Sequence, residues 1–201
     1  MLDRARRLQG RARDAVVEHS LAAPPPAGLS RRLDRSGAAR GYDRAVTIAL
    51  GQTTGAKPPF KFSAFTRVGF SDTDAQGIVY YGRYLPYFDT ARVEYARHLR
   101  LFEADLGDSE FVMRAVGVVY EAPAVFDDLL EVFVRTKRIG RTSVTADFAA
   151  YRVDDDVVMC TSEQTLVLVD LGERRPTAVP EAYRRAVAEF EGADLELAVP
   201  L

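Results

Sequence analysis

The sequence has one cysteine, two histidines and no long apolar run. Because Cys160 stands alone, it excludes an internal disulfide and a cysteine-based zinc cluster, which fits a reducing compartment. No apolar run approaches the about 20 residues that a membrane-spanning helix needs, and the arginine-rich N-terminus lacks the apolar segment of a secretory signal. These absences predict a cytoplasmic protein without a membrane span.

Charge divides the chain into two regions. Residues 1–58 hold 11 lysines and arginines against 5 acidic residues, whereas residues 59–201 hold 16 against 24. In the first region, "APPPAG" at residues 23–28 stops a helix and "LSRRLDRSGAARG" at residues 29–41 has the composition of a linker. We therefore predict a basic, flexible extension over 1–58, one folded domain over 59–192 and a C-terminal tail over 193–201. The alternative for the extension is a basic arm that binds RNA, membrane lipid or a partner protein.

Hydrophobic periodicity within the domain predicts five strands and two helices. Apolar and polar residues alternate over 60–70, and residues from about 83–85 to 101 recur at helical spacing with Pro86 in the first turn. Four segments rich in β-branched and aromatic residues follow at 112–126, 128–140, 142–153 and 156–171, and a short helix follows Pro180. Because the connections are short, we expect an α+β domain with antiparallel strand pairs.

An acidic motif, "DTDAQGIVYYGRYLPYFDTAR" at residues 72–92, joins the first strand to the long helix. No histidine lies in it to act as a base. Spacing alone leaves Asp74 as either a helix cap or a catalytic carboxylate, and it favours a turn or cap role for Asp72. Gly77 is expected to permit a backbone conformation that is closed to other residues.

This motif resembles that of hotdog-fold acyl-CoA thioesterases of the 4-hydroxybenzoyl-CoA thioesterase type, in which Asp-x-Asp-x-x-Gly-x-Val precedes the central helix. The resemblance continues through "GVVYEAPAVFDDLLEV", "RIGRTS" and "VDLGERRPTAVP", and it covers roughly residues 60–185. It implies a single hotdog domain, with a five-stranded antiparallel sheet wrapped around one long helix. Since such a subunit leaves a sheet edge and a helix face uncovered, we expect a homodimer or homotetramer with active sites at subunit interfaces.

The resemblance also implies how the enzyme hydrolyses an acyl-CoA thioester. Asp74 is the position that matches the family's catalytic carboxylate, as general base or nucleophile. The backbone N–H groups of Tyr81 and Gly82, at the start of the helix, are expected to hold the oxyanion. Many relatives carry histidine at the position of Tyr81, so only the backbone contribution is expected here. Tyr81 and Tyr84 are the predicted contacts of the acyl group.

Coenzyme A also requires cations for its phosphates, and we expect no other cofactor and no metal. The segment "RTKRIGRTS" at residues 135–143 gathers four cations about one turn, of which Arg138 and Arg141 are the predicted phosphate contacts. The alternative interpretation is an ordinary solvated hairpin with charges that protect a sheet edge. We predict no nucleic-acid partner.

Two other functions stay open at this point. The first is a thioesterase for an acyl or polyketide chain on an acyl carrier protein, against which Asp74 counts, because such relatives often carry asparagine there. The second is a non-catalytic binding module, which the intact Asp74 also disfavours. The sequence has no Gly-x-Ser-x-Gly motif, which argues against an α/β-hydrolase.

Overall fold

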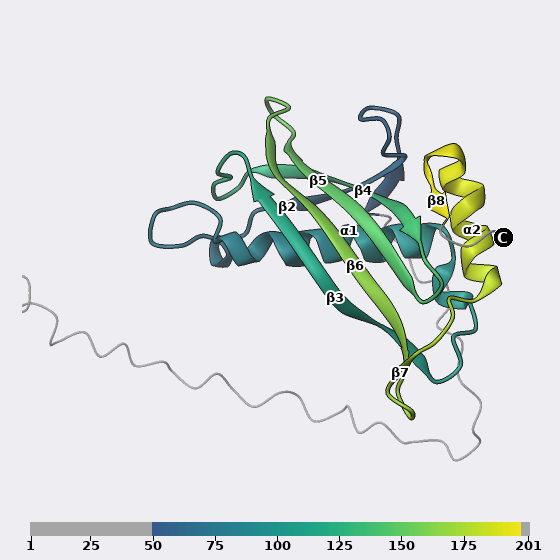
Figure 1. The fold of residues 1–201 in the computed structure, drawn as a ribbon. Helices are drawn as coiled ribbons and strands as arrows, with labels where there is room; N and C mark the ends of the chain where they lie inside the picture. The colour runs from purple at the N-terminus through teal and green to yellow at the C-terminus, as the bar shows by residue number, and fades with distance from the viewer. Residues whose placement is uncertain (1–49, 198–201) are drawn as a thin grey trace, which may run out of the picture. The chain divides into compact units, whose positions relative to one another are not determined.

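The computed structural model describes residues 50–197, and Figure 1 shows a curved sheet wrapped around one long helix. The helix α1 spans Tyr84–His98. The five long strands are β2 (Phe62–Arg67), β3 (Ser109–Tyr120), β4 (Leu129–Ile139), β5 (Ser143–Arg152) and β6 (Val158–Asp170). These five strands and the helix confirm the predicted hotdog arrangement and its order along the chain.

Three short strands extend this sheet beyond the prediction. They are β1 (Gly51–Thr53), β7 (Arg175–Pro176) and β8 (Glu196–Leu197). The strand order is β1-β2-β4-β5-β6-β3, with β7 paired to β6 and β8 paired to β4. All pairs are antiparallel except β4 with β8. Strands of two or three residues are too short to show a period in the sequence, so periodicity could not find them.

The positions of β1 and β8 bear on the expected domain boundaries. The boundary at residue 59 falls after β1, and the boundary at residue 192 falls before β8, although both strands pair with the sheet. Between β1 and β2, the Lys57 ammonium lies 4.5 Å from the ring centre of Tyr151 and forms an ion pair with Asp156. The packed region therefore includes residues on either side of 59–192. The remainder of the expected extension, residues 1–49, lies outside the described residues.

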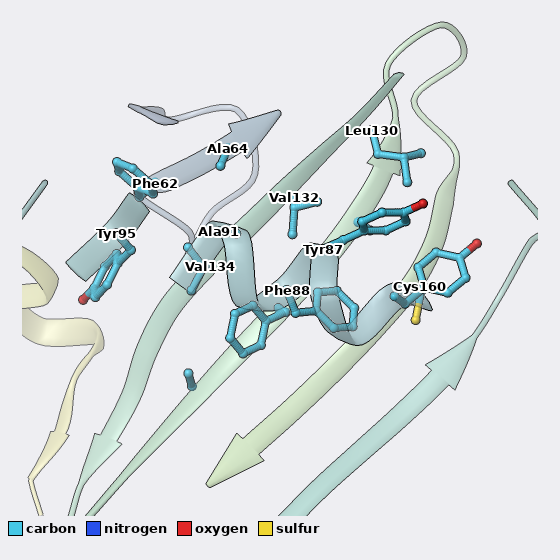
Figure 2. Packing of buried hydrophobic residues seen from close by; sticks show 14 of the residues in the cluster. Phe62, Ala64, Tyr87, Phe88, Ala91, Tyr95, Leu130, Val132, Val134 and Cys160 are labelled. Carbon is cyan, nitrogen blue, oxygen red and sulfur yellow. The ribbon is translucent and has the colours of Figure 1, made fainter. Parts of the chain in front are cut away.

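The core lies between α1 and the concave face of the sheet (Figure 2). Phe88 is fully buried on α1, and its ring centre lies 5.2 Å from that of Phe148 on β5. The buried face of α1 recurs at three- and four-residue spacing through Tyr84, Tyr87, Phe88, Ala91 and Tyr95. This spacing is the one that predicted the helix, which begins at Tyr84 and ends at His98, within three residues of the expected end.

A second helix, α2 (Glu181–Glu191), follows Pro180 as predicted and is attached to the sheet by polar contacts. Arg184 donates through Nε to the Val179 carbonyl oxygen at 3.1 Å. Glu191 is fully buried, and its Oε1 accepts hydrogen bonds from the Tyr95 hydroxyl at 2.7 Å and from the Thr136 N–H at 2.9 Å. These bonds join α2, α1 and β4 at one end of the core.

Four 3₁₀ turns complete the described elements: η1 (Phe70–Asp72), η2 (Tyr81–Arg83), η3 (Leu101–Glu103) and η4 (Gly192–Asp194). The turns η1 and η2 flank residues 73–80 of the acidic motif, before the N-terminal end of α1. Within residues 50–197, no helix has the length and apolar character needed to cross a membrane.

Candidate active site

Asp74 lies in a tight turn between η1 and η2. Its Oδ1 accepts a hydrogen bond from the Gln76 N–H at 2.7 Å, and its carbonyl oxygen accepts one from the Gly77 N–H at 3.0 Å. Gly77 has φ +78°, the left-handed conformation that glycine adopts without strain, so the expected role of this glycine is confirmed. The Asp74 N–H donates to the Ile78 carbonyl oxygen at 2.9 Å. One hydrogen bond thus holds the Asp74 side chain, and two hold its backbone in the turn.

Asp72 anchors this turn to the helix, as its predicted turn role requires. Its Oδ2 accepts hydrogen bonds from the Gly69 N–H at 2.9 Å and from the Tyr87 hydroxyl at 2.7 Å. Its carbonyl oxygen accepts the Tyr80 N–H at 2.9 Å. Burial, together with the hydrogen bond to Asp72, raises the pKa of Tyr87, so this phenol stays protonated and continues to donate. With these bonds made, the Asp72 carboxylate is occupied by structural contacts.

The turn η2 presents the two backbone groups that were predicted to hold an oxyanion. Tyr81 and Gly82 are the first two residues of η2, and the first N–H groups of a helix have no partner within it. No acceptor within residues 50–197 lies in hydrogen-bond contact with either N–H group. Both groups are therefore available to a bound oxygen atom.

A cavity of about 360 Å³ brings three of the six predicted site residues together. Asp74, Tyr81 and Tyr84 line it, together with Gln76, Ile78, Val79, Tyr120, Glu121, Ala122 and Pro123. Tyr84 is buried, and its hydroxyl oxygen accepts a hydrogen bond from the Ala124 N–H at 3.3 Å. Burial raises the pKa of Tyr84, so a neutral phenol forms this wall. The carboxylates of Asp74 and Glu121, the start of η2 at Tyr81 and aromatic walls therefore meet in one space.

Among the cavity residues that sequence reasoning did not predict, Tyr120 and Glu121 carry polar groups and lie outside the acidic motif. They lie at the C-terminal end of β3 and just after it, nearly 40 positions from Tyr81 in the sequence. The Tyr120 hydroxyl donates to the Tyr81 carbonyl oxygen at 3.0 Å. In the segment "VYEAP" an acidic residue interrupts an apolar run, which could have marked a functional position. Nothing in the sequence, however, placed that end of the strand beside η2.

The structure does not place Arg138 and Arg141 at this cavity within one chain. In the sheet, Tyr120 pairs with Cys160, which pairs with Ala150, which pairs with Val132 of β4. Arg138 lies six residues further along β4, which corresponds to about 20 Å of strand. Arg141 lies in the turn that follows β4. Both are exposed, and contact with coenzyme A stays a prediction for them.

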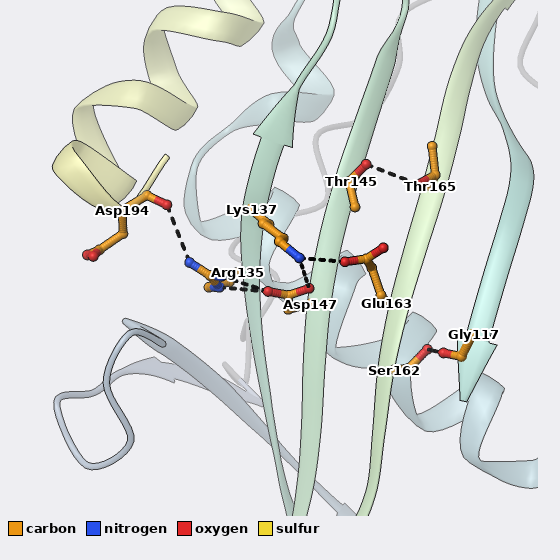
Figure 3. A network of polar contacts seen from close by, with 9 residues as sticks. All are labelled: Gly117, Arg135, Lys137, Thr145, Asp147, Ser162, Glu163, Thr165 and Asp194. Atoms are coloured by element: carbon orange, nitrogen blue, oxygen red, sulfur yellow. Dashed lines mark hydrogen bonds and ion pairs between the residues drawn. The ribbon is translucent and has the colours of Figure 1, made fainter. Parts of the chain in front are cut away.

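Two neighbouring cations of the same segment are already neutralised (Figure 3). Arg135 contacts the Asp147 carboxylate through Nε at 3.0 Å and Nη2 at 2.7 Å. Lys137 forms ion pairs with Glu163 at 2.6 Å and with Asp147 at 3.9 Å. For these two side chains the solvated-hairpin interpretation is the better one.

Comparison with known proteins connects this site to a family. The family model of the thioesterase-like superfamily matches residues 68–187, which include the acidic motif, the long helix and the four strands that follow. The chain belongs to the thioesterase-like superfamily. The predicted family and the predicted class of enzyme, a thioester hydrolase, are thereby confirmed.

Individual relatives carry more specific names. The chain is 34% identical over 128 residues to the acyl-CoA thioester hydrolase YbgC of Escherichia coli, with 62% of this chain and 92% of that protein covered. It is 31% identical to the acyl-CoA thioesterase YbgC of Haemophilus influenzae, again over 62% of this chain and 93% of the relative. The crystal structure of Slr0204, a 1,4-dihydroxy-2-naphthoyl-CoA thioesterase from Synechocystis, superposes with a TM-score of 0.58 at 18% identity, covering 64% of this chain and 96% of that one. This last likeness supports the fold alone.

Proposed function

We propose that this protein is an acyl-CoA thioesterase, which hydrolyses an acyl-CoA thioester to the free acid and coenzyme A. The observation that carries the proposal is the cavity in which Asp74 and the start of η2 meet. The names of the YbgC relatives support coenzyme A as the thiol carrier. No cofactor is needed, because coenzyme A belongs to the substrate.

The reaction begins with the thioester carbonyl group bound in the cavity. With the carbonyl oxygen at the N–H groups of Tyr81 and Gly82, Asp74 takes a proton from a water molecule whose oxygen attacks the carbonyl carbon. The tetrahedral oxyanion collapses, the carbon–sulfur bond breaks, and the coenzyme A thiolate takes up the proton. Direct attack by Asp74 on the carbonyl carbon is the second route; the carbon–sulfur bond breaks, the coenzyme A thiolate leaves and takes up a proton, and water then hydrolyses the acyl–aspartyl anhydride to the acid and free Asp74.

Glu121 is the second carboxylate that lines the cavity. His98 and Cys160 are poorly placed for this chemistry. His98 is the last residue of α1, whereas the site lies before the first residue of that helix, about 20 Å away along the helix axis. Cys160 is fully buried, and burial raises the pKa of its thiol to about 12. A thiol with that pKa stays protonated at neutral pH and is a weak nucleophile.

We further propose that the enzyme is a homodimer or a dimer of dimers. The strand β3 is the last strand of the sheet, and it pairs with β6 on one side. Its apolar side chains Val112, Met113, Val116 and Val119 are each between 45% and 55% exposed. An open strand edge with exposed apolar side chains favours pairing with another strand, and a second copy supplies one. The cavity reaches this strand at Tyr120, so the second copy would lie close to the site.

A thiol-release assay tests the function and the choice of substrate. The purified full chain is offered short, medium, long and aromatic acyl-CoA thioesters, and in parallel an acyl chain on a carrier protein. We expect release of free coenzyme A with at least one acyl-CoA at a kcat/KM above that of the carrier-bound chain. Preference for the carrier-bound chain would favour the alternative substrate, and binding of acyl-CoA without turnover would favour a non-catalytic module.

A further inference from the structure

The hydroxyl of Tyr120 reaches a backbone atom of the proposed oxyanion site. It donates a hydrogen bond to the carbonyl oxygen of Tyr81 at 3.0 Å. That carbonyl group and the Gly82 N–H belong to one peptide unit. Because a peptide unit is planar and trans, its C=O and N–H bonds point in opposite directions, and a contact that holds the oxygen also determines where the N–H points.

We propose that Tyr120 is a positioning residue, which holds the Tyr81–Gly82 peptide in the orientation that directs the Gly82 N–H at the substrate oxyanion. This inference rests on the proposed thioesterase function and deepens it. The hydrogen bond also polarises the peptide, since a hydrogen bond accepted at the carbonyl oxygen strengthens the N–H as a donor. The effect increases when the substrate fills the cavity and excludes water from the phenol.

The strand that carries Tyr120 makes its hydroxyl a fixed point. Tyr120 pairs with Cys160 on β6, and the following N–H, of Glu121, donates to the Met159 carbonyl oxygen at 2.9 Å. Its ring lies edge-on to Tyr84, with the ring centres 5.8 Å apart, and Tyr84 is itself buried. The phenol is therefore positioned by the sheet and by the first residue of α1.

The peptide that accepts the bond lies in a segment where such support matters. The turn η2 is a single 3₁₀ turn, a conformation with poorer hydrogen-bond geometry than the α-helix that follows. Gly82 contributes no side chain to hold the peptide in place. The Tyr81 ring contributes a weaker restraint, edge-on to the Tyr120 ring with the ring centres 6.5 Å apart. The hydroxyl bond is thus the directional contact between β3 and this peptide.

The test compares Tyr120→Phe with Tyr151→Phe in the full-length protein. Tyr120→Phe removes the donor and keeps the ring, and the Tyr81 carbonyl oxygen stays accessible to water, so the fold should survive. Tyr151→Phe removes a hydroxyl from the outer face of the sheet, on β5, and serves as the matched control. Two inhibitors extend the comparison: a thioether analogue of the substrate, which has no carbonyl, and a trifluoromethyl ketone analogue, whose hydrate resembles the tetrahedral intermediate.

We expect Tyr120→Phe to lower kcat by roughly 10-fold, less than the 10²-fold or more lost when an oxyanion donor itself is removed. Affinity for the trifluoromethyl ketone should fall by a similar factor, whereas affinity for the thioether should stay within about 2-fold of wild type. Replacement of Tyr120 by 3-fluorotyrosine, which keeps the donor, should restore kcat. Tyr151→Phe should match wild type in kcat and in its affinity for both inhibitors.

Two results would overturn the inference. One is a Tyr120→Phe enzyme with wild-type kcat and wild-type affinity for the trifluoromethyl ketone. The other is an equal fall in the affinity for both inhibitors, since general damage to the cavity weakens them alike. Failure of the thioesterase function is a separate result, because it would appear as a wild-type enzyme that releases no thiol from any substrate.

Discussion

The buried carboxylate of Glu191 gives a prediction about what holds α2 to the rest of the domain. Its Oε1 accepts hydrogen bonds from the Tyr95 hydroxyl and the Thr136 N–H, and both donors belong to residues that are only 3% exposed. Glu191→Ala leaves these two donors buried without an acceptor. An orphaned buried polar group costs about 1–3 kcal/mol, so the variant should lose about 2–6 kcal/mol of unfolding free energy.

Glu191→Gln is the matched variant, because its side-chain oxygen can accept both hydrogen bonds. We expect it to stay within about 1 kcal/mol of wild type, the usual range for a single net hydrogen bond. Tyr95→Phe removes one donor, so the double variant with Glu191→Ala should lose less than the sum of the two single losses. Urea unfolding followed by circular dichroism measures all four proteins.

The pH dependence provides a second readout of the same group. Burial raises the pKa of Glu191 in the folded protein above its ordinary value of 4.5. At pH values between the unfolded and the folded pKa of Glu191, the folded state binds more protons than the unfolded state. The stabilisation that this proton gives the folded state is therefore complete below about pH 4.5 and is lost as pH rises through the folded pKa. Glu191→Gln should lack this loss. A Glu191→Ala protein that loses less than 1 kcal/mol, or a glutamine variant with the wild-type pH dependence, would refute the reasoning.

Three further predictions concern the site, the extension and the assembly. Asp72→Asn should lower the unfolding free energy by no more than about 1 kcal/mol, because its amide oxygen can still accept from the Gly69 N–H and the Tyr87 hydroxyl, and it should change kcat far less than a change at Asp74; an abolished kcat would contradict this. Deletion of residues 1–49 should leave folding and turnover near wild type. Deletion of residues 1–58 also removes β1 and Lys57 and should lower the melting temperature; equal melting temperatures of the two deletion variants would contradict this. Light scattering should show a dimer or tetramer, and Val116→Lys on β3 should weaken it; a fully active wild-type monomer would contradict this.

The long elements were predictable from the sequence because periodicity reports burial directly. The apolar positions of α1 recur at three- and four-residue spacing, and the five long strands alternate or run apolar over at least six residues. The turn around Asp74 was predictable in kind, since aspartate and glycine at that spacing favour a tight turn. A strand such as β1, with three residues, leaves no period to read.

The composition of the cavity was only partly predictable, because it depends on strand register. The motif placed Asp74, Tyr81 and Tyr84 together, since they lie within eleven consecutive residues. Tyr120 reaches η2 only because β3 pairs with β6 in one particular register, and that register brings the end of β3 to the start of the helix. Register also sets the distance from the cavity to Arg138, which the spacing of residues along the chain does not reveal.

The role of Asp74 is the central claim, and kcat of Asp74→Asn tests it most directly. Asparagine keeps the shape of the side chain and an oxygen for the Gln76 N–H, but it is neither a base nor a carboxylate nucleophile. We predict that kcat for the best acyl-CoA substrate falls by roughly 10²- to 10⁴-fold with little change in substrate affinity. Asp154→Asn, the same substitution at an exposed hairpin position, should match wild type, and Tyr81→Phe should be mild because it keeps the backbone N–H. Near-normal turnover by Asp74→Asn, with turnover abolished in Asp72→Asn or Tyr81→Phe, would contradict the assignment of the catalytic carboxylate.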